Sequence, residues 1–172
     1  TNPKICRAVS GRVEVCNSKY GNNGWLGIAS VWVSGSHITQ GTVKLNDTYF
    51  NTAKYNTPAW RRFVMCQEIG HTFGLDHQDV DFGNQNLGTC MDYTNDPSGM
   101  INGQLNNEHP NQHDHDHLVT IYGHLDTFTT IFSSKTSSAA VTSIDGLDPS
   151  QLGRVIRKSA NGRNVLHERD LG

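Results

Sequence analysis

Charge is scarce in this sequence, and positive charge is not in excess. Asp, Glu, Lys and Arg make up 17% of the 172 residues, and the formal net charge is −2 at pH 7. Without a basic field the chain has nothing to hold nucleic acid or an anionic membrane, so we expect neither as a partner. No apolar run approaches the roughly 18 residues of a membrane-spanning helix. The length fits one globular domain, with or without a tail, and we expect a monomer.

The four cysteines include no Cys-x-x-Cys pair, which argues against a cysteine zinc site. Their even number allows two disulfides in three possible connectivities. We favour Cys6–Cys16 and Cys66–Cys90; the alternative is four reduced cysteines in a cytosolic protein. Disulfides, Asn/Gly-rich loops and low Lys content together indicate a secreted, extracellular protein. Residues 1–4 do not resemble a signal peptide, and we expect them to be a processed start.

Local patterns predict three early strands and two later helices. Alternation and β-branched content predict strands over residues 9–16, 25–33 and 37–45, with β structure continuing to Asn56. A helix is predicted over residues 59–75, because Thr57 and Pro58 form a start signal and Gly74 a stop signal. Residues 76–111 are predicted to form a loop, and a loop of that length is more often functional than idle. A second helix is expected from about Asp114.

The pattern divides the chain into three parts. Residues 1–126 are expected to form the main domain, and residues 127–143 a Ser/Thr/Ala-rich linker. Residues 144–172 form a C-terminal extension, in which residues 153–166 can make a hairpin around Ala160-Asn161-Gly162.

The most informative segment is Gln67-Glu-Ile-Gly-His-Thr-Phe-Gly-Leu-Asp-His77. It resembles the H-E-x-x-H-x-x-G-x-x-H pattern of the metzincin zinc peptidases at Glu68, His71, Gly74 and His77. Helix positions i and i+4 share a face, so the ligands at 67 and 71 converge on one ion while Glu68 faces a bound water. A glycine at 74 lets the chain turn and bring back His77 as a further ligand.

A second segment strengthens this resemblance. Cys90-Met91-Asp92-Tyr93 is similar to the Met-turn of the metzincins, which implies that Met91 lies beneath the metal without ligating it. The Met-x-Tyr form resembles the astacin and serralysin branches of a clan that also contains the matrixins. In those branches the Tyr can ligate zinc and swing away to stabilise the oxyanion, and this role would fall to Tyr93. Residues 41–46 resemble the edge strand that pairs with extended substrate.

The resemblance covers roughly residues 9–126 and implies an α+β fold. We expect a twisted, mostly parallel sheet with an active-site helix, a Met-turn and a C-terminal helix. The N-terminal helix of the family has no counterpart here, because the residues before Thr57 are predicted to form strands.

One departure from the pattern is large. The first ligand position holds Gln67, whose side-chain oxygen reaches about as far as an imidazole nitrogen and is also neutral. A carbonyl oxygen is a harder and weaker donor to zinc than imidazole, so affinity should fall. Three outcomes stay open: a weak site of two His and one Gln, a site that Tyr93 joins as a fourth ligand, or no metal.

Two other clusters have metal-like composition. Asp79, Asp81, Asn84 and Asn86 offer oxygen ligands for calcium, but their spacing is not that of an EF-hand, and a solvated turn is the preferred interpretation. For His113-Asp-His-Asp-His117 we prefer a helix start, in which the Asp side chains satisfy free backbone N–H groups.

The sequence therefore predicts a zinc endopeptidase that acts on peptide or protein substrates, with zinc as cofactor and Glu68 as general base. One alternative is the same fold with an impaired site, which captures peptide without cutting it because Gln67 replaces the first His. Another is a structural domain in which the metal only holds the fold together.

Overall fold

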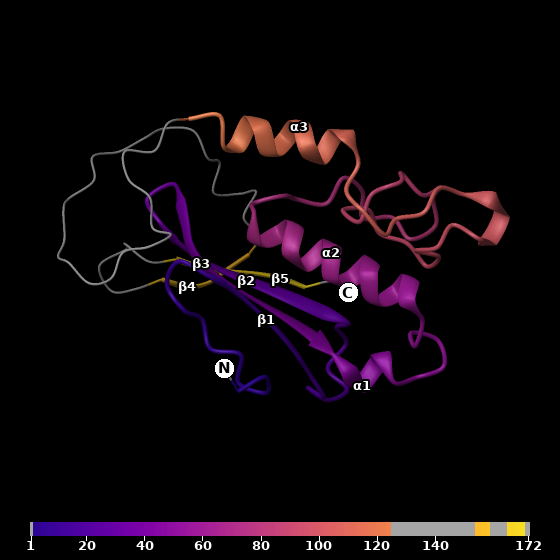
Figure 1. The fold of residues 1–172 in the computed structure, drawn as a ribbon, viewed down its shortest axis with the longest axis horizontal. Helices are drawn as coiled ribbons and strands as arrows, with labels where there is room; N and C mark the ends of the chain where they lie inside the picture. The colour runs from indigo at the N-terminus through magenta and orange to yellow at the C-terminus, as the bar shows by residue number, and fades with distance from the viewer. Residues whose placement is uncertain (1, 125–153, 159–164, 171–172) are drawn as a thin grey trace.

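The protein is described by a computed structural model for residues 2–124, and for the backbone of residues 154–158 and 165–170 (Figure 1). Its class is α+β, as expected. The elements, in chain order, are β1 (Val13–Ser18), β2 (Gly27–Ser34), β3 (His37–Asn46), α1 (Asp47–Phe50), α2 (Pro58–Thr72), the 3-10 helix η1 (Ile101–Gly103), α3 (Gln112–Ile121), β4 (Arg154–Lys158) and β5 (Val165–Asp170). In Figure 1, α2 lies between the sheet and α3.

The sheet is mixed, so the expectation of a mostly parallel sheet is wrong. Its strand order is β1-β3-β2-β5-β4, and only β1 and β3 pair in parallel. The other three pairings are antiparallel. The reason at β2 and β3 is their short connection: Gly35 has a φ of +62°, which suits a tight hairpin turn, and such a turn makes neighbouring strands antiparallel.

β3 lies inside the sheet, which corrects the expectation that residues 41–46 form an edge strand. β1 pairs with one side of β3 and β2 with the other. Three consecutive residues of β3, Gly41, Thr42 and Val43, are buried. A continuous buried run is typical of a strand covered on both faces, and the alternation seen in the sequence does not distinguish this from a half-exposed edge.

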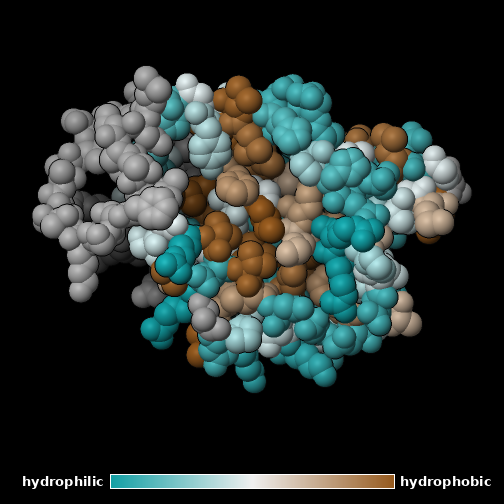
Figure 2. Space-filling view, viewed as in Figure 1, coloured by the Kyte–Doolittle hydropathy of each residue, from teal (hydrophilic) through white to brown (hydrophobic). Residues whose placement is uncertain are grey.

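Helix α2 forms where the sequence predicts it, three residues shorter at its end and one longer at its start. Thr57 caps it by accepting a hydrogen bond from the Trp60 backbone N–H at 3.3 Å, and Pro58 occupies its first turn. Trp60, Phe63 and Val64 pack with residues of β2 and β3 into one apolar core. Figure 2 shows apolar side chains gathered over α2 and between α2 and α3, with hydrophilic side chains around them.

Two helical elements differ from expectation. α1 lies where β structure was predicted, because Asn46 ends β3 and caps the new helix by accepting from the Thr48 N–H at 3.1 Å. α3 begins two residues before Asp114, which forms a capping box with Asn111. Asp116 does not take part in this cap; its carboxylate accepts from the Gln112 side chain.

The C-terminal hairpin joins the main sheet. β4 and β5 pair antiparallel, as expected of a hairpin, and β5 also pairs with β2. The predicted linker, residues 127–143, and the predicted turn at Ala160-Asn161-Gly162 lie outside the described residues. Among the described helices, none combines the length and the apolar character that crossing a membrane requires.

Both predicted disulfides are confirmed. Cys6 pairs with Cys16 at a Cα–Cα distance of 5.8 Å, and Cys66 pairs with Cys90 at 5.9 Å. The second disulfide links α2 to the loop that contains Met91. Two disulfides are compatible with an extracellular protein.

Removing the second disulfide should destabilise the protein clearly. Cys66 and Cys90 are 24 residues apart, and the chain-entropy model gives a loss of about 3–4 kcal/mol for Cys66→Ala/Cys90→Ala. The matched control is Cys6→Ala/Cys16→Ala, which removes a disulfide between residues only 10 apart in sequence. Its loss of stability should be smaller than that of Cys66→Ala/Cys90→Ala, by under about 1 kcal/mol. Urea unfolding measures both losses. Free thiols at positions 66 and 90 in non-reducing peptide maps of the native protein would contradict this pairing.

Candidate active site

The buried face of α2 changes from apolar to polar along the helix. After Trp60, Phe63 and Val64, the same stripe continues with Gln67, Glu68 and His71, which are 1%, 0% and 5% exposed. These positions follow the i, i+3, i+4, i+7 spacing of a helix face that packs on a core. Burying polar side chains costs free energy unless they gain partners, so their presence on the core face points to a functional site.

The end of α2 turns the chain back toward this polar stripe. Gly74 has a φ of +91°, and its N–H donates to the His71 carbonyl at 3.1 Å. The Leu75 N–H donates to the Gly70 carbonyl at 3.2 Å. Together these two bonds form the Schellman arrangement, in which the residue of positive φ is most often glycine. The reversal carries the following residues back, and His77 comes to lie beside His71.

The two histidines face each other through their Nε2 atoms, which are 3.0 Å apart. The Nδ1 atom of His71 lies 2.8 Å from the Leu75 carbonyl oxygen. Because a carbonyl only accepts, Nδ1 carries the proton and donates, and the lone pair of neutral His71 is on Nε2. That lone pair points at His77. The structure thus brings together two of the predicted metal ligands.

Met91 lies under the helix next to this pair. Its side chain is fully buried, and a Cβ atom added at Gly70 would stand 2.6 Å from its sulfur. A larger residue at position 70 would force the thioether to shift. The Met91 carbonyl accepts from the Gln78 N–H at 2.6 Å, and the disulfide from Cys90 fixes the preceding residue. Met91 therefore lies against α2 at Gly70, one residue before His71.

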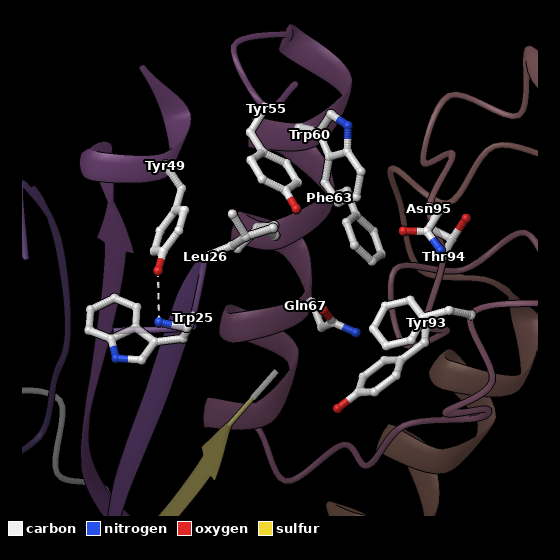
Figure 3. Close-up of a pocket in the computed structure, with 13 residues that line it drawn as sticks. Trp25, Leu26, Tyr49, Tyr55, Trp60, Phe63, Gln67, Tyr93, Thr94 and Asn95 are labelled. Carbon is white, nitrogen blue, oxygen red and sulfur yellow. Dashed lines mark hydrogen bonds between the residues drawn. The ribbon is translucent and has the colours of Figure 1, made fainter. Parts of the chain in front are cut away.

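Tyr93 contacts the histidine pair from the side. Its ring centroid is 4.6 Å from that of His77 at an interplanar angle of 67°, and Phe82 stacks on it at 4.7 Å. Its backbone N–H donates to the Asp79 carbonyl at 3.1 Å. In Figure 3 the Tyr93 hydroxyl and the Gln67 amide extend from opposite walls toward the same space.

A pocket of about 300 Å³ opens beside these side chains, and Gln67 and Tyr93 are part of its wall. Most of the wall is aromatic, and Figure 3 shows rings from α2 and from the segment before it enclosing the space. These rings belong to Trp25, Tyr49, Tyr55, Trp60, Phe63, Phe82 and Tyr93. Tyr55 and Trp60 meet edge to face, with centroids 4.9 Å apart. The pocket was missed from the sequence because Trp60 and Phe63 have the spacing of ordinary core residues.

Glu68 lies apart from the pocket wall. Its carboxylate is close to the start of β2, since a Cβ atom added at Gly27 would stand 2.6 Å from its Oε1 atom. Glu68 is not among the residues that line the pocket. The predicted general base is thus fully buried between α2 and the sheet.

The donor set fits a metal ion only if residues other than His, Cys, Asp and Glu contribute. In the part of the chain that the structure describes, no three or more side chains of these four types gather closely enough to hold an ion. The candidate centre therefore consists of the two imidazoles of His71 and His77, with Gln67 and Tyr93 as further donors. The Nε2 atom of Gln67 is buried and has no hydrogen-bond partner. This NH₂ group is a donor, so it fits an acceptor atom of a bound molecule rather than a metal ion, which only the amide oxygen of Gln67 could ligate.

The other metal-like clusters behave differently. Asp79, Asp81 and Asn84 hydrogen-bond to one another within their own turn. Asn86 lies elsewhere and bonds to the Thr94 hydroxyl and to two backbone carbonyls. The four oxygen donors considered for calcium are thus not brought together. In the cluster at residues 113–117, Asp114 accepts from the backbone N–H of the N-cap residue Asn111, as expected of a helix start, whereas Asp116 does not take part in the cap.

Two buried carboxylates hold the loops around the site, and sequence reasoning missed both roles. Asp114 accepts from the Thr89 hydroxyl and from the Gln78 amide, which joins α3 to two points of the loop that precedes Cys90. Asp92 accepts from the Leu87 N–H at 2.9 Å and from Asn107 at 2.8 Å. Burial raises the pKa of Asp92, while these hydrogen bonds oppose the rise. The Asn-x-x-Asp spacing of the α3 cap was the available signal for Asp114.

Comparisons of the chain with protein-family models, with curated proteins and with solved structures found no match. The function must therefore be argued from the residues and the geometry of this site.

The metal-free protein should lose stability in mild acid because of His77. Burial lowers the pKa of His77 from 6.5 to about 4. Between these values the unfolded chain binds a proton that the native state does not, so stability falls as the pH drops from about 6.5 toward 4. The loss assigned to this residue is on the order of 2–3 kcal/mol.

Urea unfolding at pH 7 and pH 4.5 in the presence of a chelator measures this effect. His77→Gln should flatten the pH dependence, whereas the control His113→Gln, on the exposed side of α3, should leave it unchanged. An equal loss of stability in the wild type and in His77→Gln would show that His77 is not held neutral.

Proposed function

We propose that this chain is a zinc-dependent endopeptidase domain of the metzincin type, secreted and acting on peptide or protein substrates. The observation that carries the proposal is the pair of buried imidazoles whose Nε2 atoms face each other at 3.0 Å where the chain returns over α2. The neighbouring pocket supports it, because aromatic walls with a few polar groups suit an apolar side chain of a peptide.

Zinc, when bound, lowers the pKa of its water toward neutrality and polarises the substrate carbonyl. The chain supplies the ligands and their orientation. The Leu75 carbonyl fixes the proton of His71 on Nδ1, so Nε2 is available as a donor. Gln67 contributes an amide oxygen from the preceding turn of the same helix face. Tyr93, with its hydroxyl directed into the same space, donates a hydrogen bond to the oxygen that becomes negatively charged.

Glu68 takes the proton of the attacking water at its carboxylate and passes it to the leaving amine. This role requires the carboxylate to reach a substrate in the pocket from its position above Gly27. The position of Glu68 favours a second candidate function, in which the domain binds peptides without hydrolysing them. The presence of Gln67 favours the same alternative, since an amide holds zinc more weakly than imidazole.

Restoring the third imidazole tests whether position 67 is a ligand. Gln67→His should tighten zinc binding by about tenfold or more, equivalent to about 1.4 kcal/mol, because imidazole is the better zinc donor. Gln85→His, in an exposed loop, is the control and should leave zinc affinity unchanged. Competition titration with a chromophoric chelator measures the affinity. If Gln67→His binds zinc no more tightly than the wild type, position 67 does not face the metal.

Neutralising Glu68 separates the two candidate functions. If the domain is a peptidase, Glu68→Gln should retain zinc and the fold but lose about 10²-fold or more in kcat/KM, the usual contribution of a general base. Glu14→Gln on β1 is the matched control and should retain full activity. Cleavage of an unfolded protein substrate in the presence of zinc gives the rates. Peptide binding without cleavage in the wild type would support the second candidate instead.

A further inference from the structure

The outer edge of β2 leads to the pocket. The pocket wall includes Gly24, Trp25 and Leu26, and β2 begins at the following residue, Gly27. β3 occupies the inner edge of β2 along its length. An additional strand can therefore pair with β2 only along the edge that faces away from β3, which we call its outer edge. Such a strand would pass the start of β2 and the pocket beside it.

That outer edge is taken by the chain's own strand β5. β5 pairs antiparallel with residues 28–33 of β2, and its last residue, Asp170, lies opposite Ile28. Ile28 is only two residues from Leu26 in the pocket wall. Figure 3 shows β5, in yellow, directed toward Gln67. The C-terminal strand thus follows the path that an extended peptide would take to reach the site.

We propose that segment 165–170 is an intramolecular occupant of a peptide-binding edge, and that it competes there with extended peptides that pair antiparallel with β2. Strand addition obtains its affinity from main-chain hydrogen bonds, so an incoming peptide can replace β5 without sharing its sequence. The proposal deepens the proposed function, because its effect on cleavage depends on a working peptidase. Its effect on peptide binding does not.

The tether sets the strength of this competition. β5 is joined to the domain through the Ser/Thr/Ala-rich stretch at residues 127–143. A segment of the same chain competes intramolecularly, so a peptide in solution must be present at a high concentration to replace it. Weakening β5 should therefore raise the apparent affinity for a peptide by about tenfold or more, and locking β5 in place should abolish the binding.

A crosslink in the full chain tests the pairing and provides the locked form. Ser30 and Glu168 are register partners, and opposite residues of an antiparallel pair have Cα atoms within the range that a disulfide spans. Ser30→Cys/Glu168→Cys should crosslink on mild oxidation. The control Ser30→Cys/His167→Cys should not, because a shift of one residue places the second side chain on the other face of the sheet. Peptide mapping identifies the new disulfide beside the two native ones.

A second arm weakens β5 and measures peptide binding. Leu166→Pro and His167→Pro each remove one backbone N–H from a strand with neighbours on both sides. Leu166→Ala and His167→Ala retain that N–H and serve as controls. The probe is a fluorescent peptide, Val-Leu-His-Glu-Arg-Asp with blocked ends, and fluorescence anisotropy gives its affinity. Circular dichroism confirms that each variant is folded.

The proposal predicts probe binding at least tenfold tighter in a proline variant than in its alanine control, and none in the crosslinked form. It is overturned if the matched cysteines do not crosslink, or if the crosslinked and open forms bind the probe equally. Should the proline variants fail to fold, the crosslinked form and the same variant before oxidation, with both native disulfides intact, decide the question. If no form of the protein cleaves substrate but the proline variants still bind the probe more tightly than the alanine controls and the crosslinked form does not bind it, only the peptidase function would be refuted. Equal cleavage by locked and open forms would refute this inference alone.

Discussion

The candidate site depends on the change from apolar to polar side chains along one buried face of α2. The first turns of that face anchor the helix in the core through Trp60 and Phe63. The next turns present Gln67, Glu68 and His71 to the interior, where unpartnered polar groups are costly. The Schellman turn at Gly74 limits this cost for His71, because it returns the chain over the polar stripe and supplies the Leu75 carbonyl. Burying these polar side chains lowers the stability of the fold, but it brings their nitrogen and oxygen atoms close together.

The loops around α2 are held by a disulfide and by side-chain and backbone hydrogen bonds rather than by regular secondary structure. The disulfide from Cys66 fixes the Met-turn to the helix, and the Gln78 N–H holds the Met91 carbonyl. The buried carboxylates of Asp92 and Asp114 accept hydrogen bonds from amide and hydroxyl groups of separate segments. The disulfide and the backbone bonds to Gln78 and Asp79 thus connect the segment of Met91 and Tyr93 to α2 and to the residues that follow His77. The aromatic pocket beside them gives the same region a place for an apolar side chain.

How far the sequence predicts this structure depends on the range of the interactions. Local signals identified α2, its Thr57 cap and the turn at Gly74, because each rests on contacts within a few residues. The fixed spacing of the motif indicated that His71 and His77 converge, and their Nε2 atoms lie 3.0 Å apart. The direction and order of strands depend on long-range pairing, so the sheet was wrongly expected to be mostly parallel and residues 41–46 to lie at its edge. The pairing of β5 with β2 and the partners of Asp92 lack any local signal for the same reason.

The most direct test of the account is a count of metal and ligands on the purified full chain. After equilibrium dialysis against zinc, elemental analysis gives the stoichiometry, and X-ray absorption at the zinc edge gives the number of imidazoles. The account predicts one zinc per chain, with two imidazoles and the remaining ligands oxygen. His71→Gln and His77→Gln should each remove one imidazole and weaken binding. No stoichiometric zinc, or an imidazole count unchanged by both substitutions, would contradict the assignment of this site as a metal centre.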